Sequence, residues 1–177
     1  MPVLTIRQIG DPVLRTPASA VQDPTDSRIR TLIADMFATM DHASGIGLAA
    51  PQVGIGLRIF TWDVEGSRGA VINPQLELSG PPGFVPRAEA DGQDAVVREG
   101  CLSVRGPVHG PVSRHPHAVL TGVDETGQPI REEAENLLAA CFQHEVDHLD
   151  GTLFIDRLTG DRRREAMRAL RSLETTP

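Results

Sequence analysis

The segment from Gln143 to Gly151 contains the residue types best suited to chemistry, in the pattern His-Glu-x-x-His. His144 and His148 are four residues apart, so on a helix both imidazoles lie on one face and can reach a single metal ion. Glu145 follows the first histidine, where its carboxylate can move protons on a water at that metal. The pattern predicts metal-dependent hydrolysis. The alternative is a charged helix face that carries two histidines by chance.

A second segment, Glu99-Gly100-Cys101-Leu102-Ser103, offers a further ligand. A catalytic site of the zinc type needs three protein ligands and one open position for water. Cys101 is the candidate for the third position and would add one sulfur to the two histidine nitrogens. Taken alone, this cysteine is better explained as a buried structural thiol. Beside the histidine pattern, the ligand interpretation is favoured.

A third segment, the loop from Gly45 to Gly54, is rich in small residues and contains Gln52. Gly45 and Gly47 permit a close approach between the backbone and a ligand, and the Gln52 amide is able to donate a hydrogen bond to an oxyanion. A phosphate-binding loop is the competing interpretation, but no Lys-Ser/Thr follows and the spacing differs from GxGxxG. For Gln52 alone, a loop amide bonded to the backbone remains the alternative.

Together, the three segments resemble the peptide deformylase family, the metal enzymes that remove the N-formyl group from the N-terminal formyl-methionine of newly made proteins and release formate. The family pattern has a GxGLAAxQ loop, an EGCLS segment and a QHExDHLxG helix. This chain has them in the same order, at residues 45–52, 99–103 and 143–151. The resemblance extends from about Ile6 to Leu158.

The resemblance implies a role for each matching position. The metal would be held by Cys101, His144 and His148. Glu145 would take a proton from the water on the metal and later give it to the leaving amine. The side chain of Gln52 and the backbone N–H of Leu102 would stabilise the tetrahedral oxyanion. The family usually uses Fe(II), and zinc or another divalent ion fits the same ligands.

The substrate site that the resemblance implies is the loop Gly45-Ile46-Gly47 together with Leu137 and Cys141. Leu137, Cys141, His144 and His148 follow one another at steps of four, three and four, so they share one helical stripe. Cys141 would line the pocket for the first side chain of the substrate. A thiol in the core is a nearly equal alternative.

Three places differ from the family pattern. Arg105 stands where many members have proline. Residues 106–110 occupy the place where some members carry an arginine that contacts the substrate backbone. Asn136 stands where members often have glycine before the Leu-Leu of the metal helix. The four remaining histidines match no ligand position, and we expect ordinary surface or core roles for His42, His109, His115 and His117.

Composition limits the other possibilities. The 177 residues are 40% hydrophobic and 23% charged, as is typical of a globular protein with a real core. No apolar run approaches the roughly 18 residues of a membrane span, and no signal peptide is evident. A net charge of −7 argues against a direct nucleic-acid role. Without a secretion signal, we expect the two cysteines to remain free thiols, and the family resemblance implies a location in the bacterial cytoplasm.

The expected fold is α+β, with small antiparallel sheets packed around a central metal-binding helix and with an N-terminal and a C-terminal helix. A single catalytic domain would span residues 1–177. The first segment, residues 6–21, is expected to be extended or irregular, because Pro12 and Pro17 argue against a long helix there. The expected helices begin near Asp23–Asp26, Glu133 and Asp161 and end near Gly45, Asp150 and Leu173. The expected strands cover residues 57–63, 70–72, 95–97, 117–124 and 128–132, and residues 80–92 form a loop.

The expected C-terminal helix carries the basic run Arg162-Arg163-Arg164. Such runs are usually solvated faces. The sharper alternative, from the family resemblance, is a contact with the ribosome. Two other function classes stay open: a metallopeptidase of the broader His-Glu-x-x-His type, and a non-catalytic relative that only binds peptides or ribosomes. The position of Cys101 argues against the first, and the complete set of candidate residues argues against the second.

Overall fold

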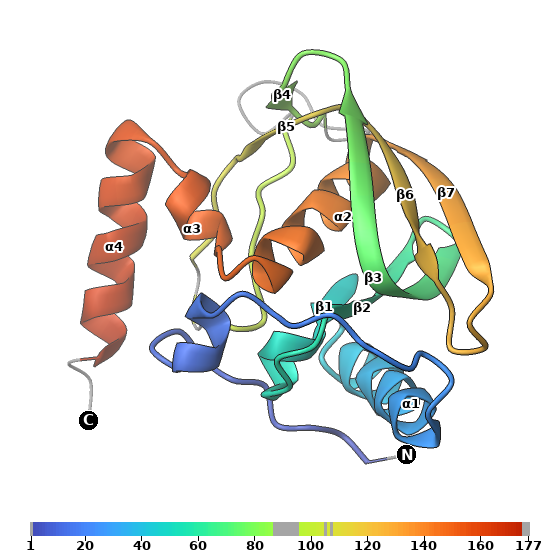
Figure 1. Cartoon of the computed structure of the whole chain (residues 1–177). Coiled ribbons are helices and arrows are strands. Elements are labelled where there is room, and N and C mark those ends of the chain that lie inside the picture. Colours follow the sequence, from blue (N-terminus) through green and yellow to red (C-terminus); the bar gives the residue numbers. More distant parts are fainter. Residues whose placement is uncertain (1, 87–95, 105, 107, 175–177) are drawn as a thin grey trace.

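The computed structural model describes residues 2–86, 96–104, 106 and 108–174. Helix α2 (Asn136–Leu149) lies at the centre, and strands β3, β6 and β7 curve past one side of it (Figure 1). Helix α1 (Ser27–His42) lies beneath it, while α3 (Phe154–Arg157) and α4 (Gly160–Glu174) lie on the other side. The arrangement confirms the predicted α+β class.

The main sheet has five antiparallel strands in the order β1-β2-β3-β6-β7. Their bounds are β1 Gly47–Ala49, β2 Ile59–Val64, β3 Ser67–Ser79, β6 His117–Val123 and β7 Pro129–Glu135. A second, two-stranded sheet pairs β4 (Gly83–Phe84) with β5 (Ser113–Arg114). The predicted hairpin is confirmed, since β6 and β7 pair from His117↔Glu135 to Val123↔Pro129.

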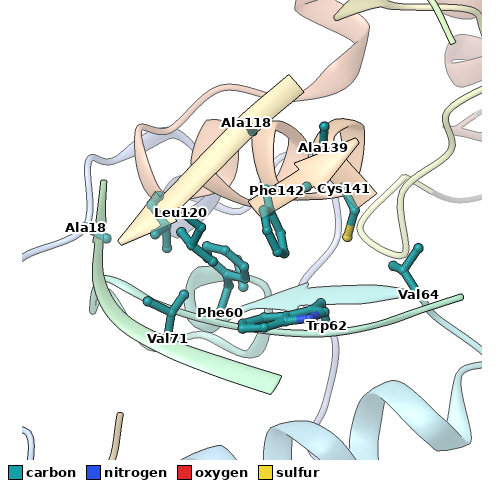
Figure 2. Close-up of a cluster of buried hydrophobic side chains, with 13 residues drawn as sticks. Ala18, Phe60, Trp62, Val64, Val71, Ala118, Leu120, Ala139, Cys141 and Phe142 are labelled. Atoms are coloured by element: carbon teal, nitrogen blue, oxygen red, sulfur yellow. The ribbon is translucent and has the colours of Figure 1, made fainter. Parts of the chain in front are cut away.

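Aromatic packing fixes how α2 faces the sheet. Phe142 of α2 lies against Phe60 and Trp62 of β2, with ring centroids 5.9 and 5.1 Å apart (Figure 2). Each such pair contributes about 0.5–1.5 kcal/mol beyond its burial. Residues two positions apart on a helix point about 200° from one another. Burying Phe142 against the sheet therefore turns His144 toward the opposite side.

Helix α1 begins where the sequence predicts. The carboxylate of Asp26 caps it by accepting a hydrogen bond of 2.8 Å from the Arg28 N–H, the usual role of aspartate at this position. Its apolar stripe packs on β1 and β2. The stripe consists of Ile29, Ile33, Met36 and Met40, all buried.

The predicted start of the metal helix was wrong by three residues. Strand β7 continues through Glu135, because residues 133–135 pair with β6. The helix begins at Asn136, which has a left-handed φ of +48° and donates its N–H to the Pro116 carbonyl at 2.9 Å. This left-handed residue redirects the chain from the strand into the helix.

One strand was predicted too short, and some elements were not predicted at all. Strand β3 runs well past the predicted residues 70–72 and crosses a register shift between Ile72 and Gln75. The 3-10 helix η1 (Pro12–Arg15) and helix α3 were not predicted. Strand β4 lies within the loop expected at 80–92. Residues 87–92 of that loop, Ala95 of the predicted strand and Arg105 fall outside the described residues. The prediction of a strand was wrong for residues 96 and 97, which form only an isolated bridge between Val96 and Pro86.

The C-terminal helix follows the prediction closely. Leu170 of α4 is buried and Met167 is partly buried, and both join the cluster that contains Val104 and Val108. The exposed side of the helix carries the arginine run, and the Arg162 guanidinium lies 5.1 Å from the ring centre of Phe84. In the described part of the chain, no helix is long and apolar enough to cross a membrane.

Candidate metal centre

Three donor atoms converge where α2 meets the segment at residues 99–104. The ligand atoms of Cys101, His144 and His148 all lie within 4.8 Å of one another. Cys101 Sγ is 3.1 Å from His148 Nε2, and the two imidazole centroids are 4.9 Å apart. A tetrahedral ion bound at about 2.0–2.3 Å holds its donors at similar separations. One sulfur and two nitrogens are also a chemically suitable set, so the residues present fit a divalent metal ion.

Backbone hydrogen bonds place Cys101 at this point. Glu99 and Gly110 exchange two N–H···O bonds of 2.8 and 2.9 Å, which fix the segment just before the cysteine. The Val104 N–H then donates to the Cys101 carbonyl at 2.9 Å and closes a tight turn. The N-terminal segment adds a bond from the Ile9 N–H to the Ser103 carbonyl. The backbone around Cys101 is therefore held by its own turn, by Gly110 and by the N-terminal segment.

A buried carboxylate orients the first histidine. Glu99 Oε2 lies 2.9 Å from His144 Nδ1, which leaves Nε2 of that ring to face the site. Arg114, 4% exposed, donates to both oxygens of Glu99 at 2.8 and 2.9 Å. Burial opposes ionisation of Glu99, but the hydrogen bonds from Arg114 and His144 outweigh it and lower its pKa to about 2. Glu99 is therefore ionised at neutral pH.

Arg114 also connects this pair to the metal helix. Its Nη1 donates to Asp147 Oδ2 at 2.7 Å, and Arg157 of α3 binds the same carboxylate. The sequence analysis assigned no role to Glu99, Arg114, Asp147 or Arg157. The only sequence feature that could have drawn attention to Glu99 and Asp147 is their place inside the family motifs. Arg114 lies 15 positions beyond Glu99 and carries no local signal.

Glu145 lies in a tight and buried setting. The residue is 3% exposed, and its Oε2 has no hydrogen-bond partner within the described residues. Burial raises its pKa to about 7. A Cβ at Gly47 would overlap Glu145 Oε1 and press on the Cys141 sulfur. Glycine is thus needed at position 47 to leave room for the carboxylate, not only for a ligand.

The orientation of the Gln52 amide is fixed by the backbone. Gln52 is 2% exposed and lies in the 3-10 helix η2 (Ala50–Val53). Its Oε1 accepts a hydrogen bond of 2.7 Å from the Ala49 N–H, so the Nε2 end must face the site. There Nε2 lies 3.5 Å from Cys101 Sγ and 3.4 Å from Ser103 Oγ. Both contacts are long, and the amide remains able to donate to another acceptor.

A cavity of about 380 Å³ opens beside these groups. The structure brings every predicted substrate residue to its wall, namely Gly45, Ile46, Gly47, Leu137 and Cys141. Cys101, Leu102, His144, Glu145 and Gln52 line the same cavity, whereas His148 is 1% exposed and lies behind it. Val108, Arg98 and His109 also line it and were not predicted.

Cys141 contributes a neutral wall to this cavity. Burial, with added repulsion from Glu145 and Glu99, raises the pKa of its thiol well above the usual value. Its sulfur lies 3.6 Å from the Ile46 carbonyl. Both cysteines are free thiols. Cys141 is therefore buried in the core and also borders the cavity.

Comparison with known proteins gives a consistent result over nearly the whole chain. The sequence profile of the family described as polypeptide deformylase matches residues 3–164. The peptide deformylase of Acidothermus cellulolyticus is 49% identical over 174 residues, which cover 98% of this chain and 89% of that protein. The peptide deformylase of Mycolicibacterium paratuberculosis is 44% identical over 183 residues, covering 97% and 89%.

Comparison with solved structures gives the same result as comparison of sequences. The peptide deformylase from Synechococcus elongatus, crystallised in complex with actinonin, has a TM-score of 0.82 and 38% identity, covering 96% of this chain and 86% of that chain. The peptide deformylase from Legionella pneumophila has a TM-score of 0.82 and 35% identity, covering 99% and 100%. The chain therefore belongs to the polypeptide deformylase family, the metal-dependent hydrolases that remove the N-formyl group from newly made proteins.

Proposed function

We propose that this chain hydrolyses the formyl group of formyl-methionyl nascent peptides at an ion held by Cys101, His144 and His148. The observation that carries the proposal is that these three donors lie within 4.8 Å of one another beside a cavity that Glu145 and Gln52 line. A bound divalent ion supplies Lewis acidity and lowers the pKa of a water to near neutrality. The remaining steps belong to side chains of this protein.

The ion is proposed to be Fe(II), with zinc or another divalent ion able to replace it. One thiolate and two imidazoles suit both metals, since imidazole binds iron and zinc and thiolate is a soft ligand. The support for iron comes from the family resemblance. Fe(II) is redox-active, and a thiolate beside it is open to oxidation, so an iron-loaded protein should lose activity in air.

Glu145 is proposed as the proton carrier. It adjoins His144 in sequence, and its buried Oε2 has no partner among the described residues. Its carboxylate takes a proton from the attacking water and delivers that proton to the nitrogen of the leaving amine. Formate and a free amino terminus result. A buried carboxylate suits this task because general acid–base groups work best with a pKa near the working pH.

The oxyanion is proposed to form between Gln52 and Leu102. The amide of Gln52 points its Nε2 toward the cavity because Ala49 holds its Oε1. The Leu102 N–H donates to no acceptor in the described part of the chain, while its carbonyl is held by Gln8 at 3.1 Å. Two preset donors stabilise negative charge as it develops on the formyl oxygen.

The first substrate side chain is proposed to enter between Ile46, Leu137 and Cys141. Ile46 is 47% exposed at the cavity mouth, and an apolar surface there suits the thioether of methionine. Gly45 and Gly47 flank Ile46 on the loop that forms this wall. The peptide backbone is proposed to lie along it.

The test is formate release after the metal-free protein is reconstituted anaerobically with Fe(II) or zinc. A formyl-Met-Ala peptide should release formate, while acetyl-Met-Ala should remain intact. Cleavage of an internal peptide bond would instead favour a general metallopeptidase, and no hydrolysis with either metal would favour a binding protein. Iron-loaded protein exposed to air should lose activity faster than zinc-loaded protein.

The setting of the reaction is part of the proposal. Residues 1–177 would act as one catalytic domain in the bacterial cytoplasm, where formylated chains are made. The exposed arginines of α4 would contact the ribosome. They are Arg162, Arg163, Arg164, Arg168 and Arg171. Replacing Arg163 and Arg164 by glutamate should reduce cosedimentation with ribosomes in a salt-dependent manner and leave the cleavage of short peptides unchanged.

A further inference from the structure

The short helix α3 contacts the metal helix at two places. The Phe154 ring stacks on the His144 imidazole, with centroids 6.3 Å apart and planes inclined by 26°. Arg157 binds Asp147 with two hydrogen bonds, from Nη2 at 2.5 Å and from Nε at 3.1 Å. In Figure 1, α3 lies between α2 and α4. The first element after the metal helix therefore folds back onto it.

The charges around Arg114 balance only when Arg157 is counted. Glu99 and Asp147 are carboxylates whose side chains are 9% and 10% exposed, and both bind the one guanidinium of Arg114, which is 4% exposed. Two buried carboxylates that share one cation repel each other and compete for it. Arg157 adds the second positive charge from the protein surface, with 51% of its side chain exposed.

Arg157 is connected to His144 by a continuous series of hydrogen bonds. Arg157 holds Asp147, Arg114 is then able to keep both of its bonds to Glu99, and Glu99 keeps its bond to His144 Nδ1. A carboxylate on the far nitrogen of a metal-bound histidine fixes its tautomer and ring orientation. Removing the bond between Arg157 and Asp147 should therefore make the orientation of the His144 imidazole less fixed.

We infer that Arg157 is a positioning residue for His144, acting through Asp147, Arg114 and Glu99. The inference rests on the proposed role of His144 as a metal ligand. Direct outer partners of metal ligands typically contribute 10–100-fold in metal affinity or activity. Arg157 is more remote and half exposed, so its removal should weaken metal binding by roughly three- to tenfold.

The test uses Co(II) as the probe, because its visible spectrum reports ligand geometry and its affinity is measurable by chelator competition. Arg157→Met should weaken Co(II) binding as stated and alter the visible bands. Arg157→Lys, which keeps the charge, should show a smaller loss. Arg58→Met is the matched control, because Arg58 binds Asp150 at the C-terminal end of the same helix at 2.7 Å without touching the network.

The route through Asp147 has its own test. In an Asp147→Asn background, no second carboxylate competes with Glu99 for Arg114. Arg157→Met should therefore change the Co(II) affinity by less than about twofold in that background. An equal loss in both backgrounds would overturn the inference. So would an Arg157→Met protein that matches Arg58→Met in affinity and spectrum, or one that binds Co(II) less tightly with an unchanged spectrum.

A final variant separates this inference from the proposed function. His144→Ala should abolish tight Co(II) binding. If it binds Co(II) as tightly as the parent protein, the ligand assignment itself fails. If it loses the ion while Arg157→Met behaves like the Arg58 control, the metal site stands and only the role of Arg157 is wrong.

Discussion

Glu145 shows how much a single position depends on its neighbours. Its carboxylate is buried beside His144, and the space it occupies exists because residue 47 has no side chain. The glycine-rich loop and the metal helix are nearly 100 residues apart in sequence, yet they meet at this point. The chemistry of Glu145 therefore depends on Gly47 as well as on the metal ligands.

Replacing Gly47 by alanine should displace the Glu145 carboxylate, because the added Cβ would overlap Oε1. We expect kcat to fall by about tenfold or more, up to the roughly 10²–10⁴ that a general acid–base group contributes, with the metal content unchanged. Gly56→Ala is the matched control, since a Cβ there meets nothing within 4 Å. Equal kcat values in the two variants would contradict the steric argument.

Replacing Gln52 by alanine should lower kcat more than it raises KM. An oxyanion donor acts mainly in the transition state, and loss of one donor costs about 10²–10³ in kcat. Steady-state kinetics on a formyl-Met peptide measure both constants. If only KM changed, Gln52 would position the substrate and would not stabilise the oxyanion.

At the scale of elements, the junction between β7 and α2 sets the start of the metal helix. Asn136 takes a left-handed conformation there, with φ of +48°. Asparagine and glycine adopt this conformation more readily than other residues. The observation gives a physical reason for asparagine in this chain and for the glycine that the family resemblance leads us to expect at this place.

We expect Asn136→Gly to be as stable as the parent protein or slightly more stable, and Asn136→Ala to lose about 1–2 kcal/mol of unfolding free energy. Urea unfolding measures the difference. Glu135→Ala serves as the control, because Glu135 is exposed with an ordinary extended φ of −128°, and should change stability by less than about 0.5 kcal/mol. Equal stability of the glycine and alanine variants at 136 would count against strain at this residue.

The residues that sequence analysis identified are those whose signal is local. His144 and His148 share a helical face, and the three family motifs are short runs. The boundary at Glu133 was misplaced because glutamates favour helix, while pairing with β6 holds residues 133–135 in a strand. Arg114 and Arg157 were missed because their partners lie 10–33 positions away, and no local pattern encodes such contacts.

For the whole molecule, the proposed ion would join two separate parts of the fold. Cys101 belongs to the segment held by Gly110 and the N-terminal residues, while the two histidines belong to the central helix. An ion that binds only the folded state stabilises it in proportion to its affinity and concentration. Metal loading should therefore be visible in global unfolding.

Removing the ion with a chelator should lower Tm by roughly 5–10 °C. Binding at 100 times Kd contributes about 2.7 kcal/mol, and each kcal/mol shifts Tm by about 2–4 °C for a chain of this size. Thermal unfolding with and without added zinc measures the shift. Cys101→Ser should lose most of this response, because a hydroxyl replaces the thiolate poorly. A full response in that variant would remove Cys101 from the ligand set.

The most direct test of the proposed mechanism is to measure metal content and formate release on the same preparation of Glu145→Gln. The three ligands are intact in this variant, so it should keep its ion and an unchanged Co(II) spectrum. Turnover of a formyl-Met peptide should fall by about 10²–10⁴, because the proton carrier is gone. Turnover within roughly threefold of the parent protein at equal metal content would contradict the mechanism.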